Sequence, residues 1–310
     1  MTEAHAKLSM LGGTTTDSVA RCELPRSFVR RSRRVEFPGG SGHTLAGILD
    51  QPEGFDDAPV LIFSHCFTCN KDLKTIVRLS RLLCERGFSI LRYDMTGLGN
   101  SAGSFATTNF STNLADLLAA VRFSLDSIGP PRFLLGHSLG GAVSLAAAGQ
   151  WPRELPLPSG VATLAAPSDT RHLADLLVRM DWRVHSEGRG EVVIGGRRWE
   201  TTPQLIADLR GFDLPRRIAN IQLPVLLFHS PVDETVGFDH ALRILSWVGG
   251  GSSAIGITGG QPGWLPSSSP PGTKASLITL PGADHLLTNN PLDLDFMSNI
   301  LAAWMLRNAR

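Results

Sequence analysis

The stretch FLLGHSLGGAVSLAAAG, residues 133–149, decides how the rest of the chain is interpreted. Its first residues are apolar and predict a buried strand, and the small residues at its end predict a helix. Between them stands GHSLG, residues 136–140, which places a G-x-S-x-G sequence in a strand–turn–helix setting. The glycines two positions before and after the serine remove side chains that would collide in so tight a turn. We therefore expect Ser138 to present a nucleophilic hydroxyl above the edge of a sheet.

The sequence around this stretch alternates between strand and helix patterns. That context matters, because a G-x-S-x-G sequence also arises by chance in a chain with 32 glycines. Continuous apolar runs at residues 59–65 and 88–94 predict buried strands, and residues 72–85 carry an apolar face at helical spacing. Residues 33–50 predict an entry hairpin. The pattern therefore predicts an α/β fold with a mostly parallel sheet and helices on both faces.

Length and composition favour a protein with a large core and a small neutral partner. The chain has 310 residues, of which 42% are hydrophobic, and its 29 Lys and Arg nearly balance its 28 Asp and Glu. This balance provides no excess of positive charge with which the protein could bind nucleic acid. No apolar run approaches the ~20 residues that span a bilayer, and no secretory signal pattern stands at the N-terminus. Four cysteines fit a reducing compartment, so we expect a cytoplasmic protein, with a mitochondrial location as the weaker alternative.

The pattern divides the chain into a tail and one domain. Residues 1–31 lack a sustained period and predict a mobile tail, and residues 32–310 predict the domain. Residues 168–221 interrupt the strand pattern, with a probable hairpin around residues 195–196, and predict a small cap that supplies an apolar pocket wall. Residues 249–274 are rich in Gly, Ser and Pro and predict a flexible surface insertion.

Loops after two later strands offer an acid and a base for the serine. A serine nucleophile needs a base, the base needs an orienting carboxylate, and after a strand–turn–helix elbow they follow in the order Ser, Asp or Glu, His. Asp233 is the first carboxylate after the strand expected at residues 223–230, and His285 follows the strand expected at residues 276–280. The sequence therefore predicts a triad of Ser138, Asp233 and His285, which requires no cofactor or metal.

Two neighbouring residues compete for these roles. Glu234 is a second carboxylate in the same loop, and His240 is a second histidine. Glu234 stands one position further from the strand, and His240 lies on a helix expected from residue 238 to 248. We therefore favour Asp233 and His285.

The serine also requires two backbone N–H donors for an oxyanion. One is the N–H of Leu139, at the start of the helix behind the serine, where the helix N-terminus favours negative charge. The other comes from the loop after the first parallel strand, residues 64–68. Its position there favours the N–H of Phe67, with Cys66 as the alternative.

A glycine-rich segment, TGLGNSA at residues 96–102, superficially matches a dinucleotide fingerprint. Such a loop must open directly into a helix that holds the pyrophosphate. Here the loop continues, and the next helix is expected only from residue 113 to 125. We therefore interpret the glycines as a sharp turn and expect no nucleotide cofactor.

Cys66 and Cys69 form a C-x-x-C sequence, which suggests a second class of function. A dithiol placed before the helix expected at residues 72–85 would suit thiol redox chemistry. No second cysteine pair completes a zinc site, and small side chains are useful in an oxyanion loop. A redox role therefore stays the alternative to hydrolysis.

Several segments of the chain are similar to one known superfamily. They are SHCFTCNKDLKTIVRLSRLL, LRYDMTGLGNSAGSFATTNFSTN, GHSLGGA, LAAPSD, FHSPVDETV and PGADHLL. Together they resemble the α/β-hydrolase superfamily, and more narrowly the hydrolase that is fused to an OsmC domain in many proteins. The resemblance covers about residues 35–304 and implies Ser138, Asp233 and His285 as nucleophile, acid and base. The chain departs from the fused form in ending at Arg310 without an OsmC domain and in the insertion at residues 249–274.

These observations favour a serine hydrolase that cleaves a small carboxylic ester or thioester through an acyl-enzyme. Acyl transfer to an acceptor other than water stays open on the same scaffold. A binding protein without catalysis is disfavoured because no member of the triad is missing. Relatives with an aspartate nucleophile are disfavoured because the elbow holds Ser138.

Overall fold

The computed structural model describes residues 27–187, 189–194, 196–250 and 274–309. The expected tail and the expected insertion at residues 249–274 lie almost wholly outside these ranges. The first strand already begins at Arg30, two residues before the expected start of the domain. Within the described ranges, no helix is long and apolar enough to cross a membrane.

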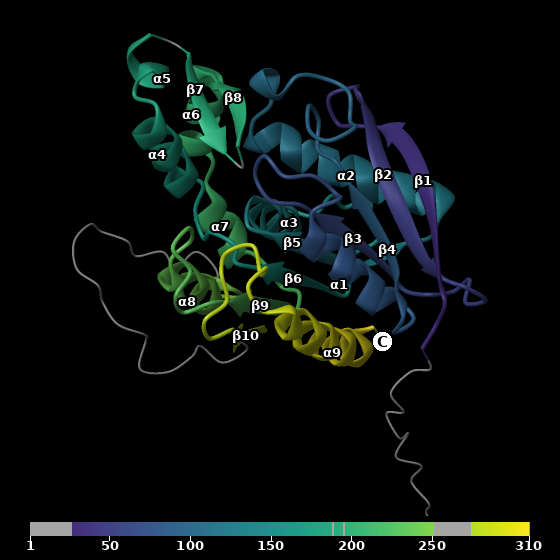
Figure 1. Cartoon of the computed structure of the whole chain (residues 1–310). Coiled ribbons are helices and arrows are strands. Elements are labelled where there is room, and N and C mark those ends of the chain that lie inside the picture. The colour runs from purple at the N-terminus through teal and green to yellow at the C-terminus, as the bar shows by residue number, and fades with distance from the viewer. Residues whose placement is uncertain (1–26, 188, 195, 251–273, 310) are drawn as a thin grey trace, which may run out of the picture.

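Eight strands form the main sheet, and most of them are parallel (Figure 1). Their order across the sheet is β1-β2-β4-β3-β5-β6-β9-β10. The strand β2 pairs antiparallel with both β1 and β4, and the strands from β4 to β10 pair in parallel. The strands are β1 (Arg30–Pro38), β2 (Thr44–Pro52), β3 (Val60–Ser64), β4 (Ser89–Tyr93), β5 (Pro131–His137), β6 (Gly160–Leu164), β9 (Val225–His229) and β10 (Ala275–Thr279). The mostly parallel sheet predicted from the alternating pattern is confirmed.

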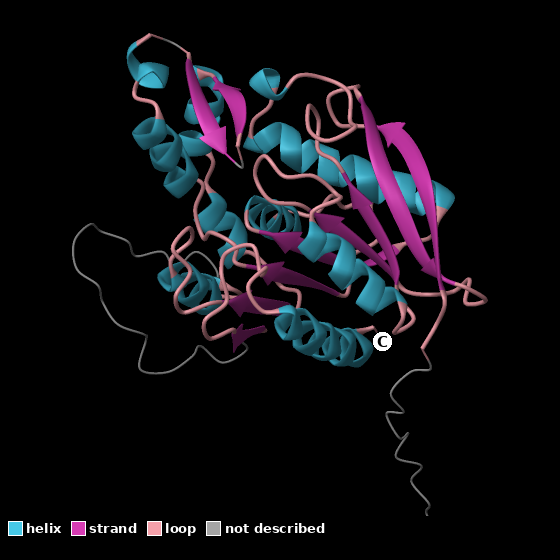
Figure 2. Ribbon diagram, viewed as in Figure 1, coloured by secondary structure: helices cyan, strands magenta, loops and turns pink. Residues whose placement is uncertain are grey.

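Helices cover both faces of this sheet, as expected (Figure 2). The helices α1 and α9 pack on one face, and α2, α3 and α8 pack on the other. Among the described residues outside 168–221, the helices are α1 (Lys74–Cys84), α2 (Phe110–Ser127), α3 (Leu139–Gly149), α8 (Phe238–Trp247) and α9 (Pro291–Asn308), and the 3-10 turn η1 (Phe105–Thr107) precedes α2.

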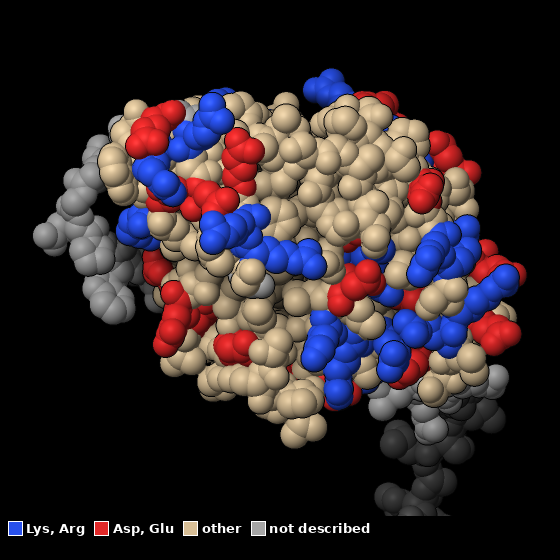
Figure 3. All heavy atoms as spheres, turned by 45° about the horizontal axis from the view of Figure 1, so that its top comes forward, with Lys and Arg blue, Asp and Glu red and all other residues tan. Residues whose placement is uncertain are grey.

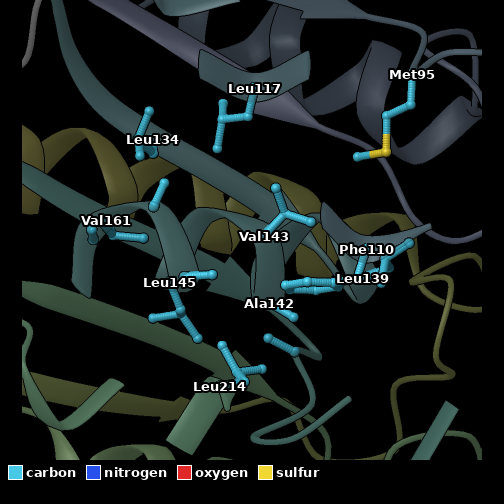
Figure 4. Packing of buried hydrophobic residues seen from close by; sticks show 14 of the residues in the cluster. Met95, Phe110, Leu117, Leu134, Leu139, Ala142, Val143, Leu145, Val161 and Leu214 are labelled. Carbon is cyan, nitrogen blue, oxygen red and sulfur yellow. The ribbon is translucent and has the colours of Figure 1, made fainter. Parts of the chain in front are cut away.

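The side chains of β5 pack into both halves of the core, because they alternate between the two faces of the sheet. Phe133 and Leu135 are buried in the cluster under α1 and α9. Leu134, between them, is buried in the cluster with α2 and α3 that Figure 4 shows in close-up. A strand buried on both faces has to be apolar at every position, which explains its continuous apolar sequence.

The helix α2 begins at Phe110 rather than near Asn113, where the sequence pattern had placed its start. Asn109 caps it: its side chain accepts a hydrogen bond from the N–H of Thr112 at 2.8 Å, and the Thr112 hydroxyl accepts one from the N–H of Asn109 at 2.8 Å. This reciprocal capping box lets the helix begin one turn earlier than its apolar pattern indicates.

The helix α3 consists mostly of small residues, and other backbones approach it closely. At its end, a Cβ atom added to Gly149 would lie 1.9 Å from the backbone oxygen of Arg217. Arg217 belongs to α7 (Leu214–Ala219), the last element before β9. The end of α3 is therefore in direct backbone contact with the segment that leads back into the sheet.

The residues between β6 and β9, which we call the cap segment (residues 168–221), form a group at one end of the sheet (Figure 1). Their elements are α4 (Arg171–Met180), α5 (Arg183–Ser186), β7 (Gly190–Ile194), β8 (Arg197–Thr201), α6 (Pro203–Gly211) and α7. The hairpin expected around residues 195–196 is the antiparallel pair of β7 and β8. Trp199 on β8 packs edge-on against Phe105, which packs edge-on against Phe67, so the hairpin contacts the loop after β3 through a chain of rings.

Candidate active site

Ser138 stands at the turn between β5 and α3 in a strained backbone conformation. Its φ of +53° lies in the left-handed region, which non-glycine residues rarely adopt, and its N–H donates to the Leu164 oxygen at 2.7 Å. A Cβ atom on Gly136 would lie 2.2 Å from the Gly140 oxygen, and one on Gly140 would lie 2.2 Å from the Ser64 oxygen. Both glycines are therefore required by the close approach of backbones at the elbow.

The structure brings Ser138, His285 and Asp233 into one hydrogen-bonded chain. The Nδ1 atom of His285 lies 2.8 Å from Oδ2 of Asp233, and its Nε2 lies 3.0 Å from Oγ of Ser138. Because a carboxylate only accepts hydrogen bonds, the Nδ1 of His285 carries the proton. The Nε2 atom is then free to accept the hydroxyl proton of Ser138.

Asp233 is held as a carboxylate by its surroundings. It is 8% exposed and accepts hydrogen bonds from the N–H groups of Thr235 at 2.8 Å and Val236 at 2.9 Å. Burial raises the pKa of this carboxyl, but the hydrogen bonds from His285 and from the two N–H groups outweigh burial, so the pKa lies below its ordinary value of 3.8. The loop after β9 therefore presents a charged group to His285.

Neither competing residue joins this chain. Glu234 is exposed, on the outer side of the loop. His240 lies on α8, as expected, and its Nδ1 accepts a hydrogen bond from the N–H of Ser168 at 3.0 Å. The Ser168 hydroxyl lies 3.0 Å from the same nitrogen, so the protein contains a second, fully buried serine–histidine pair.

His137 has a part in the site that the sequence analysis did not assign. Its Nε2–H donates to the backbone oxygen of His285 at 2.8 Å, and the two rings lie 5.3 Å apart. Burial, followed by the nearby His285, lowers the pKa of His137 to about 3, so the ring is neutral. This bond ties the loop that carries His285 to the residue before Ser138. In the sequence, the one available signal of this role is that His137 occupies the variable position directly before Ser138 in the G-x-S-x-G sequence.

The expected oxyanion donors are the N–H groups of Phe67, in the loop after β3, and of Leu139, the first residue of α3 and the neighbour of Ser138. Both residues line the same cavity as Ser138. Over residues 27–187, 189–194, 196–250 and 274–309, neither N–H group donates to another protein atom. The loop is fixed at its start by His65, whose Nε2 accepts from the N–H of Met95 at 3.0 Å. At its end, Lys71 donates to Asp94 through both its N–H, at 2.6 Å, and its Nζ, at 2.8 Å. The loop that carries the Phe67 N–H is therefore fixed at both ends, whereas the Leu139 N–H is held by the start of α3.

The cysteine count favoured a reducing compartment, but the structure pairs Cys66 with Cys69 in a disulfide. The N–H of Cys69 donates to the Cys66 oxygen at 3.2 Å, which closes a tight turn and brings the two Cα atoms to 5.3 Å. That separation lies within the range a disulfide requires. Thr68, inside this turn, has a φ of +58°, a rare value for a β-branched residue. The disulfide therefore spans the strained part of the loop that carries Phe67.

A cavity of about 590 Å³ opens in front of Ser138 and His285. The loop of residues 66–70 forms one wall, with both cysteines of the disulfide. The cap segment forms another wall through apolar residues, which are Leu173, Leu176, Met180, Val193 and Ile194. Arg197, from the same segment, also lines the cavity. The site therefore combines a nucleophile with a mostly apolar pocket of a size that suits a small molecule.

Charged side chains of both signs lie on the surface of the protein (Figure 3). Figure 3 shows positive and negative side chains interspersed on the face that it presents, as the nearly balanced composition predicts. In the part of the chain that the structure describes, no three His, Cys, Asp or Glu side chains gather in an arrangement that could hold a metal ion.

Comparison with known proteins gives one family and several similar structures. The model of the alpha/beta hydrolase family matches residues 61–294. The esterase domain of a Rhodothermus marinus protein is 35% identical, with a TM-score of 0.64, over 89% of this chain and 98% of that domain. Est1E from Butyrivibrio proteoclasticus, solved with ferulic acid bound, is 20% identical with a TM-score of 0.71, over 89% of this chain and 99% of Est1E. The mitochondrial palmitoyl-protein thioesterase ABHD10 of Mus musculus is 25% identical over 233 residues, 73% of this chain and 72% of that protein.

Proposed function

The chain belongs to the alpha/beta hydrolase family, and from that premise we propose that it is a serine hydrolase that cleaves a carboxylic ester or thioester through an acyl-enzyme on Ser138. The observation that carries this proposal is the hydrogen-bonded chain from Ser138 through His285 to Asp233. This is the arrangement that turns a serine hydroxyl into a nucleophile.

The reaction follows from the proton positions in this chain. As Oγ of Ser138 attacks the acyl carbon, its proton moves to Nε2 of His285, and Asp233 stabilises the imidazolium that forms. The N–H groups of Phe67 and Leu139 hold the developing oxyanion. The proton on His285 then passes to the leaving alcohol or thiol as its bond to the acyl carbon breaks. Water, deprotonated by His285, attacks the acyl carbon, and as the bond to Oγ of Ser138 breaks, His285 returns the proton to Oγ and the acid is released.

The comparisons support an ester or a thioester as the substrate. The relative from Rhodothermus marinus is described as an esterase domain, and the relative from Mus musculus as a palmitoyl-protein thioesterase. The apolar wall of the cavity suits an acyl chain in either case. We also propose that the cap segment is the lid over this pocket, and that the protein is cytoplasmic. The word "mitochondrial" in the name of the mouse relative supports the alternative location.

Labelling with a fluorophosphonate probe tests the proposal. We expect the wild-type protein to be labelled, and Ser138→Ala to lose the label together with hydrolysis of p-nitrophenyl esters. Ser168→Ala is the matched control, because Ser168 lies in the second serine–histidine pair and should not affect labelling. A wild-type protein without label, or a label that persists in Ser138→Ala, would show that the proposal is wrong. Product analysis distinguishes hydrolysis from acyl transfer.

A thiol redox function is the second candidate, and the Cys66–Cys69 disulfide is the observation that favours it. In such a reaction an external thiolate attacks Sγ of Cys69, which lines the cavity, and Cys66 leaves as a thiolate. A second external thiolate then attacks the external sulfur of the mixed disulfide, so that Cys69 leaves as a thiolate and the two external thiols are joined in a disulfide. Against this candidate, α1 begins only at Lys74, so neither sulfur lies at a helix N-terminus that would stabilise a thiolate. The association with an OsmC domain stays a prediction from the sequence.

A further inference from the structure

Of the residues that the structure describes around the cavity in front of Ser138, one has a permanently charged side chain, Arg197 on β8. Among the described residues, the lining includes no carboxylate, and no carboxylate lies within 4.0 Å of the Arg197 guanidinium. A guanidinium has five N–H donors and cannot lose its charge. The pocket therefore offers a free cation beside a mostly apolar surface.

Of the two adjacent arginines at the start of β8, Arg197 lines the cavity and Arg198 does not. Arg197 is opposite Ile194 and Arg198 is opposite Val193, and both of these partners line the cavity, so both faces of the hairpin contribute to its wall. Arg198 points to the other face, because side chains alternate along a strand. There it pairs with Glu191 at 2.8 Å. Two adjacent arginines thus differ in their surroundings, and only Arg197 faces the pocket without a partner.

We propose that Arg197 binds an anionic group of the substrate, a carboxylate or a phosphate, while the acyl chain occupies the apolar part of the cavity. This inference rests on the proposed hydrolase function and narrows its substrate class to anionic esters or thioesters. The anion belongs either to the far end of the acyl chain or to the leaving group. In both cases the charge-assisted hydrogen bonds to the guanidinium select the charged substrate over its neutral counterpart.

The exposure of the Arg197 side chain determines how strongly it can favour a charged substrate over a neutral one. The side chain is exposed, so water and salt screen its charge, and exposed ion pairs contribute little. We expect its removal to lower kcat/KM for the anionic substrate about three- to tenfold, mainly through KM. A neutral substrate of the same shape should change by less than about twofold.

Two matched substrate pairs test the proposal and separate the two positions of the anion. Mono-4-nitrophenyl suberate and 4-nitrophenyl octanoate differ in a carboxylate at the far end of the acyl chain. Butyryl-coenzyme A and S-butyryl-N-acetylcysteamine differ in the leaving group, which carries phosphates, together with the pantoyl group and adenosine, only in coenzyme A. In one of the pairs, Arg197→Gln should lower the ratio of kcat/KM between charged and neutral substrate, and the pair that responds identifies where the anion lies. Arg197→Lys should keep part of the selection, and Arg198→Gln should leave all four values unchanged.

Failure of this inference is distinguishable from failure of the proposed function. If the wild-type protein hydrolyses the esters but Arg197→Gln leaves both ratios unchanged, the role of Arg197 is refuted and the hydrolase stands. If none of the four substrates is cleaved, the proposed function fails. Calorimetric binding of monomethyl suberate and of coenzyme A to Ser138→Ala, with and without Arg197→Gln, then decides the role of Arg197. An unchanged Kd for both ligands refutes it, and a Kd that rises about three- to tenfold for one of them supports it.

Discussion

Replacement of Gly140 by alanine should disable the site although none of the proposed catalytic residues is substituted. Gly140 is the second residue of α3, and a Cβ atom there would lie 2.2 Å from the Ser64 oxygen and 2.5 Å from the His65 oxygen. Ordinary contact begins at 3.4 Å, so the first of these distances is too short by about 1.2 Å. Both oxygens belong to backbone, which cannot rotate away as a side chain can. The start of α3 and the loop after β3 must therefore move apart.

This movement acts on the two N–H groups that we propose as the oxyanion donors. Leu139 precedes Gly140 and Phe67 follows His65 by two residues, so the same separation widens the gap between their N–H groups. A misplacement of about 1 Å in a catalytic arrangement costs on the order of a hundredfold in rate. Overpacking of this kind also costs about 1–3 kcal/mol in the free energy of unfolding. We therefore expect kcat to fall about a hundredfold in a protein that still folds.

Hydrolysis of a p-nitrophenyl ester and urea unfolding measure the two effects separately. Gly211→Ala is the control, because Gly211 ends α6 and a Cβ atom there meets nothing within 4 Å. That variant should keep wild-type kcat and unfold at the same or a slightly higher urea concentration. The reasoning is refuted if Gly140→Ala keeps kcat within twofold of wild type and keeps the free energy of unfolding within about 0.5 kcal/mol of wild type.

Two further predictions concern the disulfide and Asp233. Reduction of the Cys66–Cys69 bond by a dithiol, or its removal in a Cys66→Ala/Cys69→Ala protein, should lower kcat about tenfold, because the strained loop that carries the Phe67 N–H is then less fixed. The dithiol should have no effect on the double variant, and an equal loss there would contradict the prediction. Asp233→Asn should lower kcat by about 10³–10⁴. Folding lowers the pKa of Asp233, so its carboxylate stabilises the protein above about pH 4, and this stabilisation is lost as the pH falls. The difference in the free energy of unfolding by urea between wild type and Asp233→Asn should therefore narrow from pH 7 to pH 3.5. A difference that stays constant over this range would contradict the prediction.

The sequence predicted the sheet because its strands are buried on both faces. The apolar runs of β3, β4, β5 and β9 leave few interpretations other than parallel strands between helices. The meeting of Ser138, Asp233 and His285 was predictable for a related reason. Each follows a strand of the same parallel sheet, and the carboxyl ends of parallel strands share one edge.

Features that depend on side-chain partners were not predictable in this way. The early start of α2 depends on the reciprocal bonds of Asn109 and Thr112, which the apolar periodicity does not register. The disulfide depends on the turn that brings Cys66 and Cys69 together, whereas composition only suggested a reducing compartment. The bond from His137 to the His285 oxygen joins residues 148 positions apart, so only the folded structure reveals it.

The small residues of α3 also determine in which parts of the protein the amino-acid sequence can change during evolution. At its start, α3 touches the backbone of the loop after β3, and at its end Gly149 touches the backbone of Arg217 at the base of the cap segment. Any larger side chain at either contact would push apart two pieces of main chain. The hairpin of β7 and β8 has no such contact at its tip, where a Cβ atom on Gly196 meets nothing within 4 Å. New substrate preferences can therefore evolve at the outer end of the cap segment while its base and the nucleophile remain fixed to one helix.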